Sequence, residues 1–207
     1  MNNKCIKELY VEYGLVDIQS LHPSIKSDIR YATKNNFTGK ILYTEDNGLF
    51  CIPALAEAIG NAQRELININ PTLSLVVFDA ARPLSIQRDM FELVKGTDAE
   101  RYIANPYGEY AGGFHNYGMA LDVAIVDNNG RMLDFGTEYD SFEGIAHSGR
   151  EAELVKAKKL SITAYENRML LYYVMGKNGM LPYEWEWWHF QLDYDEYNKS
   201  NYKLLDF

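Results

Sequence analysis

The chain has 207 residues, with 20 basic and 29 acidic side chains and a net charge of −9. This acidic balance argues against nucleic acid as a partner, because such affinity comes largely from neutralised phosphates. No cluster of Lys or Arg favours a membrane surface. A hydrophobic fraction of 47% supports a sizeable core, and the length fits one domain spanning residues 1–207.

The two cysteines, Cys5 and Cys51, lie far apart and form no C-x-x-C pair, which favours free thiols over a disulfide. The first fifteen residues contain no apolar run of signal-peptide length. No later stretch approaches the length of a membrane span. The sequence as given is therefore expected in the cytoplasm.

In chain order, residues 1–50 are expected to form short extended pieces and turns. A helix is predicted from Pro53 and ends by 68–71. Its apolar face consists of Leu55, Ala58, Ile59, Ala62 and Leu66. Residues 73–78 are predicted to form a mostly buried strand. A second helix follows Pro83, and its inward residues are expected to be Ile86, Met90 and Val94.

Residues 97–114 are expected to form a loop. Residues 119–126 are predicted to form a strand, which a hairpin turn follows at 127–130. A capping-box pattern at 163–166 predicts another helix, and a last strand surrounds His189. Helices and mainly antiparallel strands, without regular alternation, indicate an α+β fold in which helices flank a mainly antiparallel central sheet.

The first candidate motif, H-N-Y-G-M-A-L-D, runs from His115 to Asp122. On a strand, Asp122 would share a face with Ala120 and Ala124, which leaves room for a metal and a substrate. Gly118 can bend the chain so that the His115 side chain converges on the same point. Taken alone, an ordinary exposed Asp is about as good an interpretation, and a lone His near a loop is usually a surface residue.

The second candidate motif is E-W-W-H, from Glu186 to His189. Positions three apart on a regular strand face opposite sides, so a shared metal requires a turn or bulge around Trp187 and Trp188. We therefore expect Glu186 in the approach to the strand and His189 on the strand itself. The alternative is an aromatic core strand with charged neighbours. Together the two motifs supply two imidazoles, one carboxylate ligand and one spare carboxylate, as in catalytic zinc sites.

Arg82 stands at a predicted strand end, between Asp79 and Pro83. Its guanidinium could face the same cleft and stabilise the oxyanion of a tetrahedral intermediate. The alternative is a surface ion pair with Asp79, which contributes little. The other two histidines, His22 and His147, have no nearby ligand pattern and are expected to be structural or exposed.

Taken together, these segments resemble the zinc D-alanyl-D-alanine dipeptidases, the VanX-like family, which is related to the VanY-type D,D-carboxypeptidases. The family pattern S-x-H-x-x-G-x-A-x-D followed by E-x-W-H matches G-F-H-N-Y-G-M-A-L-D and E-W-W-H here. The segments 31–39, 79–83, 133–140 and 167–168 also resemble the family, so the likeness spans roughly residues 30–192. One departure is Gly113, where the family has Ser. The lost hydroxyl affects substrate positioning but not metal binding.

The resemblance implies a hedgehog/D,D-peptidase-like fold and one zinc ion per chain. The implied metal ligands are His115, Asp122 and His189. The implied catalytic residues are Glu186 as general base and Arg82 as the group that steadies the transition state. The resemblance further implies that Asp140 and Tyr31 hold the dipeptide near its amino group, and that Asp79 is a partner behind the metal ligands.

The expected function is therefore zinc-dependent hydrolysis of D-Ala-D-Ala to two D-alanine molecules. The expected partner is this small dipeptide, with no nucleic acid and no membrane span. One alternative is a D,D-carboxypeptidase or endopeptidase acting on peptidoglycan peptides, against which the missing export signal and wall-binding module count. Another is a non-catalytic metal-binding module, against which the presence of both Glu186 and Arg82 argues. The sequence leaves the oligomeric state open.

Overall fold

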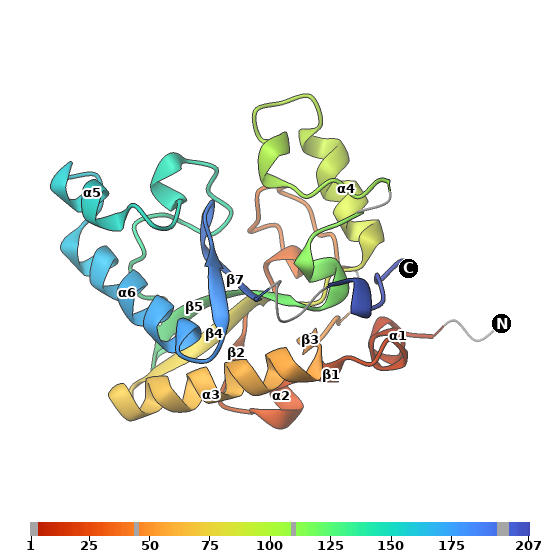
Figure 1. The fold of residues 1–207 in the computed structure, drawn as a ribbon, viewed down its shortest axis with the longest axis horizontal. Helices are drawn as coiled ribbons and strands as arrows, with labels where there is room; N and C mark the ends of the chain where they lie inside the picture. Colours follow the sequence, from red (N-terminus) through yellow and green to blue (C-terminus); the bar gives the residue numbers. More distant parts are fainter. Residues whose placement is uncertain (1–3, 44–45, 109–110, 194–198) are drawn as a thin grey trace.

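The computed structural model describes residues 4–43, 46–108, 111–193 and 199–207, and Figure 1 shows how they are arranged. A five-stranded sheet lies at the centre. In spatial order, its strands are β2 (Lys26–Ser27), β4 (Leu73–Asp79), β5 (Ala120–Asp127), β7 (Glu186–Leu192) and β6 (Met180–Tyr183). Among these strands, β2 and β4 pair in parallel and every other neighbouring pair is antiparallel. The predicted α+β fold with a mainly antiparallel central sheet is confirmed.

Helices lie on both sides of this sheet. The long helix α3 (Pro53–Ile69) packs against β4 and against α6 (Ile162–Gly176), which also contacts β5 and β6. Helix α4 (Leu84–Val94) lies on the opposite side of the sheet from α3 (Figure 1). The other regular elements of the described residues are α1 (Ile6–Glu12), α2 (Ile18–Leu21), α5 (Glu151–Lys156), the antiparallel pair β1 (Val16–Asp17) and β3 (Phe50–Cys51), and the 3-10 turns η1 (Arg30–Ala32), η2 (Glu100–Tyr102), η3 (Phe114–Tyr117), η4 (Gly144–Ala146) and η5 (Lys199–Asn201).

The two helices predicted before residue 100 form as expected. Helix α3 starts with Pro53 at its first turn, and its whole predicted apolar face is buried. In α4, Met90 and Val94 are buried as predicted, but Ile86 is only partly buried and Phe91 takes its place in the core. The inward face is turned slightly from the predicted one, so that Gln87 and Phe91 are buried, which are the residues directly after Ile86 and Met90. Adjacent positions on a helix lie about 100° apart, so a modest rotation is enough.

The two local signals later in the chain have different outcomes. The hairpin turn at 127–130 is confirmed, because Gly130 N–H donates to Asp127 O at 2.9 Å and β5 leads directly into it. The capping box at 163–166 is wrong. Helix α6 begins two residues earlier, because the Ser161 hydroxyl accepts a hydrogen bond from Ala164 N–H and is therefore the N-cap. The described residues of 97–114 are mainly loop, with η2 and the start of η3 among them.

Cys5 and Cys51 are both free thiols, as predicted. Cys51 is buried, and burial raises the pKa of its thiol well above the ordinary value. In the described part of the chain, no helix is both long and apolar enough to cross a membrane.

Candidate active site

Three predicted site residues lie in one row across three neighbouring strands. Asp122 on β5 pairs directly with His189 on β7 and with Asp79 on β4. The second pairing depends on an irregularity in β4: Val77 pairs with Val123 and Asp79 with Asp122, so Phe78 is an extra residue in the ladder. Directly paired residues point to the same face of a sheet. The register therefore brings two carboxylates and an imidazole to one face.

His115 reaches this row from outside the sheet. It lies on η3, which ends at Gly118 with a left-handed φ of 68°. A side chain at that position would also meet Leu15 at 2.8 Å, so glycine suits it on both grounds. The bend turns the chain directly into β5, and His115 and Asp122 converge as the sequence predicted.

The ligand atoms of these residues form a compact triangle. His115 Nε2, Asp122 Oδ1 and His189 Nδ1 lie 3.1 to 3.2 Å from one another. All three residues are buried. Ligands held at about 2.0–2.1 Å by a tetrahedral zinc ion are about 3.3 Å apart. The spacing therefore fits one such ion.

Hydrogen bonds on the far side of each imidazole set which nitrogen carries the proton. His115 Nδ1 lies 2.7 Å from Ala80 O and must donate to it. His189 Nε2 lies 3.3 Å from Gln191 Oε1 and donates to it in the same way. The nitrogens that face Asp122 therefore present lone pairs, as metal-ligating histidines do. Three lone pairs pointing at one place repel each other unless a cation lies between them.

The Asp122 carboxylate is held in an ionised and oriented state. Its other oxygen, Oδ2, accepts a hydrogen bond of 2.8 Å from the Tyr139 hydroxyl. Burial opposes its charge. Protons on the facing nitrogens of His115 and His189 would lower the pKa of Asp122, and a cation held in their place favours the carboxylate in the same way. Burial lowers the pKa of His189, which favours the neutral imidazole that a metal ligand needs.

Glu186 stands beside this triangle because β7 is irregular. Pro182 on β6 pairs with Phe190, yet the next residue, Tyr183, pairs with Glu186. The predicted bulge around the two tryptophans is therefore confirmed, although Glu186 is the first residue of β7 and does not precede the strand. Its carboxylate lies 3.8 Å from His189 Nδ1. Burial, followed by the charges of Asp122 and Asp140, raises the pKa of Glu186 well above its ordinary value.

The tryptophans of this motif pack into the core, so the aromatic-strand interpretation also describes part of the motif. Trp187 stacks on Phe135 with 4.2 Å between ring centroids, and Trp188 packs on Tyr139 at 5.2 Å. Both tryptophans are almost completely buried. The motif thus anchors β7 in the core at two positions and presents Glu186 and His189 at either end.

Arg82 lies in the site and not on the surface, so the surface-ion-pair alternative is wrong. It is 7% exposed, and its Nε donates to Asp79 Oδ2 at 2.8 Å. Its Nη1 donates to Gln87 Oε1, and its Nη2 lies 3.9 Å from Asp122 Oδ2. Burial opposes its charge, but Asp79 and the other acidic groups around it together outweigh this effect and raise the pKa of Arg82. Asp79 also accepts a hydrogen bond from the Tyr43 hydroxyl at 2.9 Å, so it fixes Arg82 from behind.

Asp140 and Tyr31 form a second polar group in the site. The Tyr31 hydroxyl donates to Asp140 Oδ1 at 2.9 Å, and the backbone N–H of Phe37 donates to Oδ2 at 3.1 Å. Asp140 adopts a left-handed conformation with a φ of 61°. Burial raises its pKa to about 7, against the lowering effect of these two hydrogen bonds.

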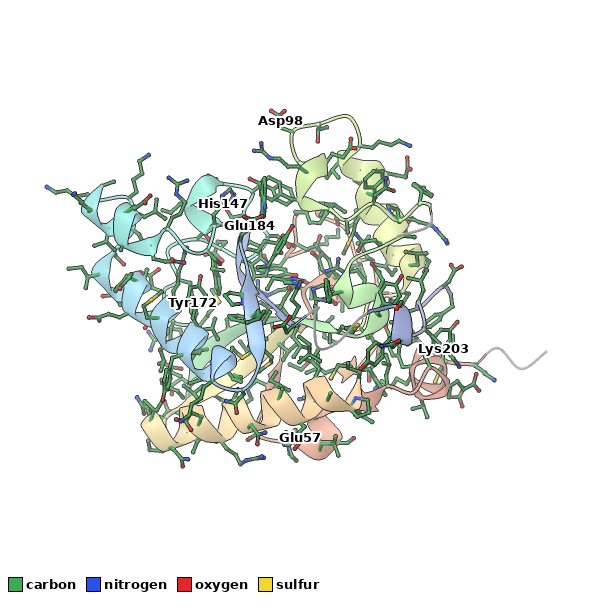
Figure 2. The ribbon with its side chains drawn as sticks, viewed as in Figure 1. Glu57, Asp98, His147, Tyr172, Glu184 and Lys203 are labelled. Atoms are coloured by element: carbon green, nitrogen blue, oxygen red, sulfur yellow. The ribbon has the colours of Figure 1, made fainter. Side chains whose placement is uncertain are left out.

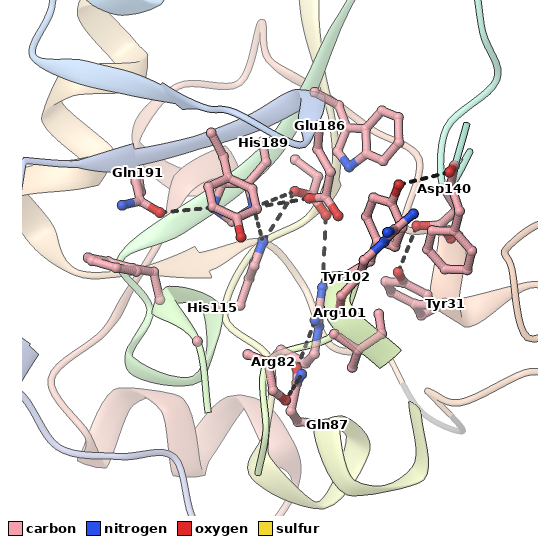
Figure 3. A pocket seen from close by; sticks show the side chains of 18 residues that line it. Tyr31, Arg82, Gln87, Arg101, Tyr102, His115, Asp140, Glu186, His189 and Gln191 are labelled. Carbon is pink, nitrogen blue, oxygen red and sulfur yellow. Dashed lines mark hydrogen bonds and ion pairs between the residues drawn. The ribbon is translucent and has the colours of Figure 1, made fainter. Parts of the chain in front are cut away.

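Every site residue predicted from the sequence except Asp79 lines one cavity of about 290 Å³ (Figure 3). The cavity thus brings together the predicted metal ligands, Glu186, Arg82, Asp140 and Tyr31. Gly113 lines it as well, and a side-chain carbon there would meet Ala104 at 3.2 Å. His22 and His147 do not line it, in line with their expected structural or exposed role.

Several residues of the site were not anticipated from the sequence. Tyr139, Gln87 and Gln191 each hold one of the predicted residues in place. Tyr139 lies in the segment 133–140 that the family resemblance covers, so a signal was present for it. The two glutamines carry no local pattern, because only the folded chain brings them to the site.

Comparison with known proteins agrees with this geometry. A family described as D-ala-D-ala dipeptidase matches residues 11–205. A D-alanyl-D-alanine dipeptidase of Escherichia coli is 29% identical over 194 residues, covering 92% of this chain and 89% of the relative. Proteins of the same name from Enterococcus faecalis and Synechocystis are 25% and 26% identical, covering 88% and 64% of this chain and 93% and 64% of the relatives.

Proposed function

Because the chain belongs to the D-Ala-D-Ala dipeptidase family of metallopeptidases, we propose that it hydrolyses D-Ala-D-Ala to two D-alanine molecules with one zinc ion per chain. The observation that carries the proposal is the convergence of three ligand lone pairs beside the Glu186 carboxylate, inside one cavity. In this proposal residues 1–207 act as one catalytic domain, and a cytoplasmic location stays a prediction from the sequence.

His115, Asp122 and His189 would hold the zinc ion. When bound, zinc supplies Lewis-acid chemistry, because it acidifies water and polarises a carbonyl group. Glu186 takes a proton from the attacking water and later passes it to the departing amine. Its raised pKa makes the carboxylate a stronger base for the first step, and the protonated form that results is the acid for the second. The Arg82 guanidinium, fixed by Asp79, binds the oxygen on which negative charge develops.

Asp140 and Tyr31 recognise the substrate's ammonium group. In a dipeptide, the residue before the scissile bond carries a free ammonium group. In a longer peptide, that residue's nitrogen is part of another peptide bond. Asp140 offers a carboxylate whose two oxygens are already oriented by Tyr31 and Phe37. A charged hydrogen bond in a site of this kind contributes about 1.5–3 kcal/mol. The Asp140 carboxylate therefore favours a free dipeptide.

Two aromatic side chains, Phe142 and Tyr102, line the cavity beside Asp140, and Trp185 packs behind them. Phe142, two residues further along, stacks on Tyr102 with 5.0 Å between ring centroids, and Trp185 packs edge-on against Tyr102 at 5.2 Å. The Tyr102 hydroxyl also donates to Phe142 O at 3.0 Å. An N-terminally extended peptide would have to pass through this wall. The wall thus favours a dipeptidase over a carboxypeptidase or endopeptidase that acts on peptidoglycan peptides.

The test of this proposal compares D-Ala-D-Ala with N-acetyl-D-Ala-D-Ala on the zinc-loaded wild-type protein. We expect kcat/KM to be higher for the free dipeptide by about tenfold or more, because acetylation removes the ammonium and adds bulk at the wall. Release of D-alanine is the readout. Preferred cleavage of the acetylated substrate would reject the dipeptidase in favour of a carboxypeptidase, and no cleavage of either would favour a non-catalytic module.

Asp140→Asn is expected to lower kcat/KM for D-Ala-D-Ala by about ten- to a hundredfold at pH 8, because a neutral amide cannot pair with the ammonium. The effect should depend on pH. Since the pKa of Asp140 is raised to about 7, the wild-type carboxylate is protonated below that value and ionised above it. The ratio of wild-type to variant kcat/KM should therefore rise as pH increases through about 7, and titrations shared by both proteins cancel in it.

The matched control for this experiment is Asp98→Asn, an exposed aspartate on the outer loop labelled in Figure 2. Its kcat/KM should follow the wild type at every pH. A wild-type to Asp140→Asn ratio that stays constant between pH 5.5 and 8 would remove Asp140 from the recognition of the ammonium.

A further inference from the structure

Arg168 is a completely buried arginine that the proposed chemistry does not use. It lies in the second turn of α6 and is 0% exposed. Its guanidinium donates to three backbone carbonyls: Nε to Phe135 O at 2.8 Å, Nη2 to Ile145 O at 2.9 Å and Nη1 to His147 O at 3.4 Å. All three carbonyls belong to the stretch between the β5 hairpin and α5. One side chain therefore ties both ends of the segment 135–147 to the same helix.

This segment carries the residues that form the amino-end side of the site. Tyr139 donates to Asp122, and Asp140 accepts from Tyr31 and Phe37. Apart from η4 the segment contains no helix or strand, so its shape depends on side-chain contacts. Asp140 lies between the carbonyls that Arg168 binds, five residues after Phe135 and five before Ile145.

The conformation of Asp140 needs such support. A non-glycine residue with a φ of 61° lies in the left-handed region, which persists only where the surroundings hold it. Within the segment, the Asp140 carboxylate and the Tyr139 hydroxyl are tied to residues on other elements. The Tyr102 hydroxyl also donates to Phe142 O, and Trp187 Nε1 donates to Thr137 Oγ1 at 2.8 Å. Arg168 adds a constraint on the backbone at both ends of the segment, from α6.

The charge of Arg168 is compensated without using up its donors. Glu151 Oε1 lies 3.8 Å from Nη1 and also accepts a hydrogen bond of 2.8 Å from the Tyr172 hydroxyl. Glu151 is itself buried, and its partner Tyr172 on α6 is labelled in Figure 2. The N–H groups of the planar guanidinium are therefore available to donate to the three carbonyls. A lysine ammonium has the charge but not the fork.

We infer that Arg168 is a positioning residue for substrate recognition: by clamping the segment 135–147 to α6, it holds Asp140 where the carboxylate can bind the substrate's ammonium. The inference rests on the proposed function. Arg168 acts through Asp140 and touches no substrate, so its loss should affect binding of the free amino end more than the chemical step.

The test uses Arg168→Lys in the zinc-loaded enzyme, with D-Ala-D-Ala and N-acetyl-D-Ala-D-Ala as the two substrates. We expect kcat/KM for the free dipeptide to fall about tenfold, mainly through a higher KM, because a charged hydrogen bond to the ammonium is weakened. The rate for the acetylated substrate, which has no ammonium, should change by less than about twofold. The preference for the free dipeptide should therefore decrease.

Val174→Ala is the matched control, because Val174 is a completely buried core residue on the same helix. It should lower thermal stability through a core cavity and leave the substrate preference unchanged. A second readout needs neither zinc nor activity: amide hydrogen exchange across 135–147 should be faster in Arg168→Lys than in Val174→Ala.

The double variant Arg168→Gln with Glu151→Gln provides a second test, which does not depend on whether the Arg168→Lys protein folds normally. It removes both charges together, so no buried charge is left without its partner. It too should lose preference for the free dipeptide. An unchanged preference in the variants, with wild-type exchange across 135–147, would overturn the clamp. Failure of the wild type to cleave either substrate would instead reject the proposed function.

Discussion

Replacement of Glu186 by Gln is expected to lower kcat for D-Ala-D-Ala by about two to four orders of magnitude, while zinc stays bound. The amide has nearly the same shape as the carboxylate but cannot take a proton from water. Zinc should remain because the three convergent ligand atoms belong to His115, Asp122 and His189 and not to Glu186. The measurement is kcat together with zinc content per chain.

Glu184→Gln is the matched control for this change, because Glu184 is exposed and lies two residues earlier, in the turn that precedes β7 (Figure 2). It should keep wild-type kcat and zinc. Turnover near the wild-type level in Glu186→Gln would remove Glu186 from the role of general base. Loss of zinc from that variant would make it a metal ligand instead.

His189→Ala is expected to abolish measurable turnover by weakening zinc binding by about a hundredfold or more. Loss of a residue that merely supports a ligand already costs about 10- to 100-fold in metal affinity, and His189 supplies one of three ligand atoms directly. Zinc should raise the melting temperature of the wild type, because an ion that binds the folded state alone stabilises it. The same addition should leave His189→Ala almost unaffected.

His22→Ala is the control, since His22 is a histidine outside the cavity that packs beside Gly60 of α3. It should bind zinc and respond to it as the wild type does. A His189→Ala protein that keeps full zinc content and turnover would contradict the assignment of the ligand triangle.

The parts of the fold that local pattern determines could be predicted from the sequence. Helix α3 shows an apolar face at helical spacing, and the turn after β5 contains N-G beside an alternating strand. Their predictions needed no tertiary information. The prediction of the N-cap of α6 was wrong, because Ser161 and Thr163 both carry a hydroxyl that can cap a helix. The local sequence does not decide between them, and Ser161 is the N-cap in the structure.

The site could be predicted as a set of residues but not as an arrangement. Sequence spacing indicated that β7 must bulge for Glu186 and His189 to meet, and it does. Nothing local indicated the extra residue Phe78, which shifts β4 so that Asp79 pairs with Asp122. Register between strands depends on contacts far apart in sequence. For the same reason the role of Arg168 could not be predicted from the sequence, because its carbonyl partners lie more than twenty residues before it.

The central claim is that one zinc ion, held by two histidines and an aspartate, enables this chain to split D-Ala-D-Ala. Its most direct test is a zinc titration of the metal-free wild-type protein, with D-alanine release as the readout. We expect no release without metal, a rise with added zinc, and a plateau at one zinc ion per chain. Release that is independent of zinc, or none at any amount of zinc, would contradict the claim.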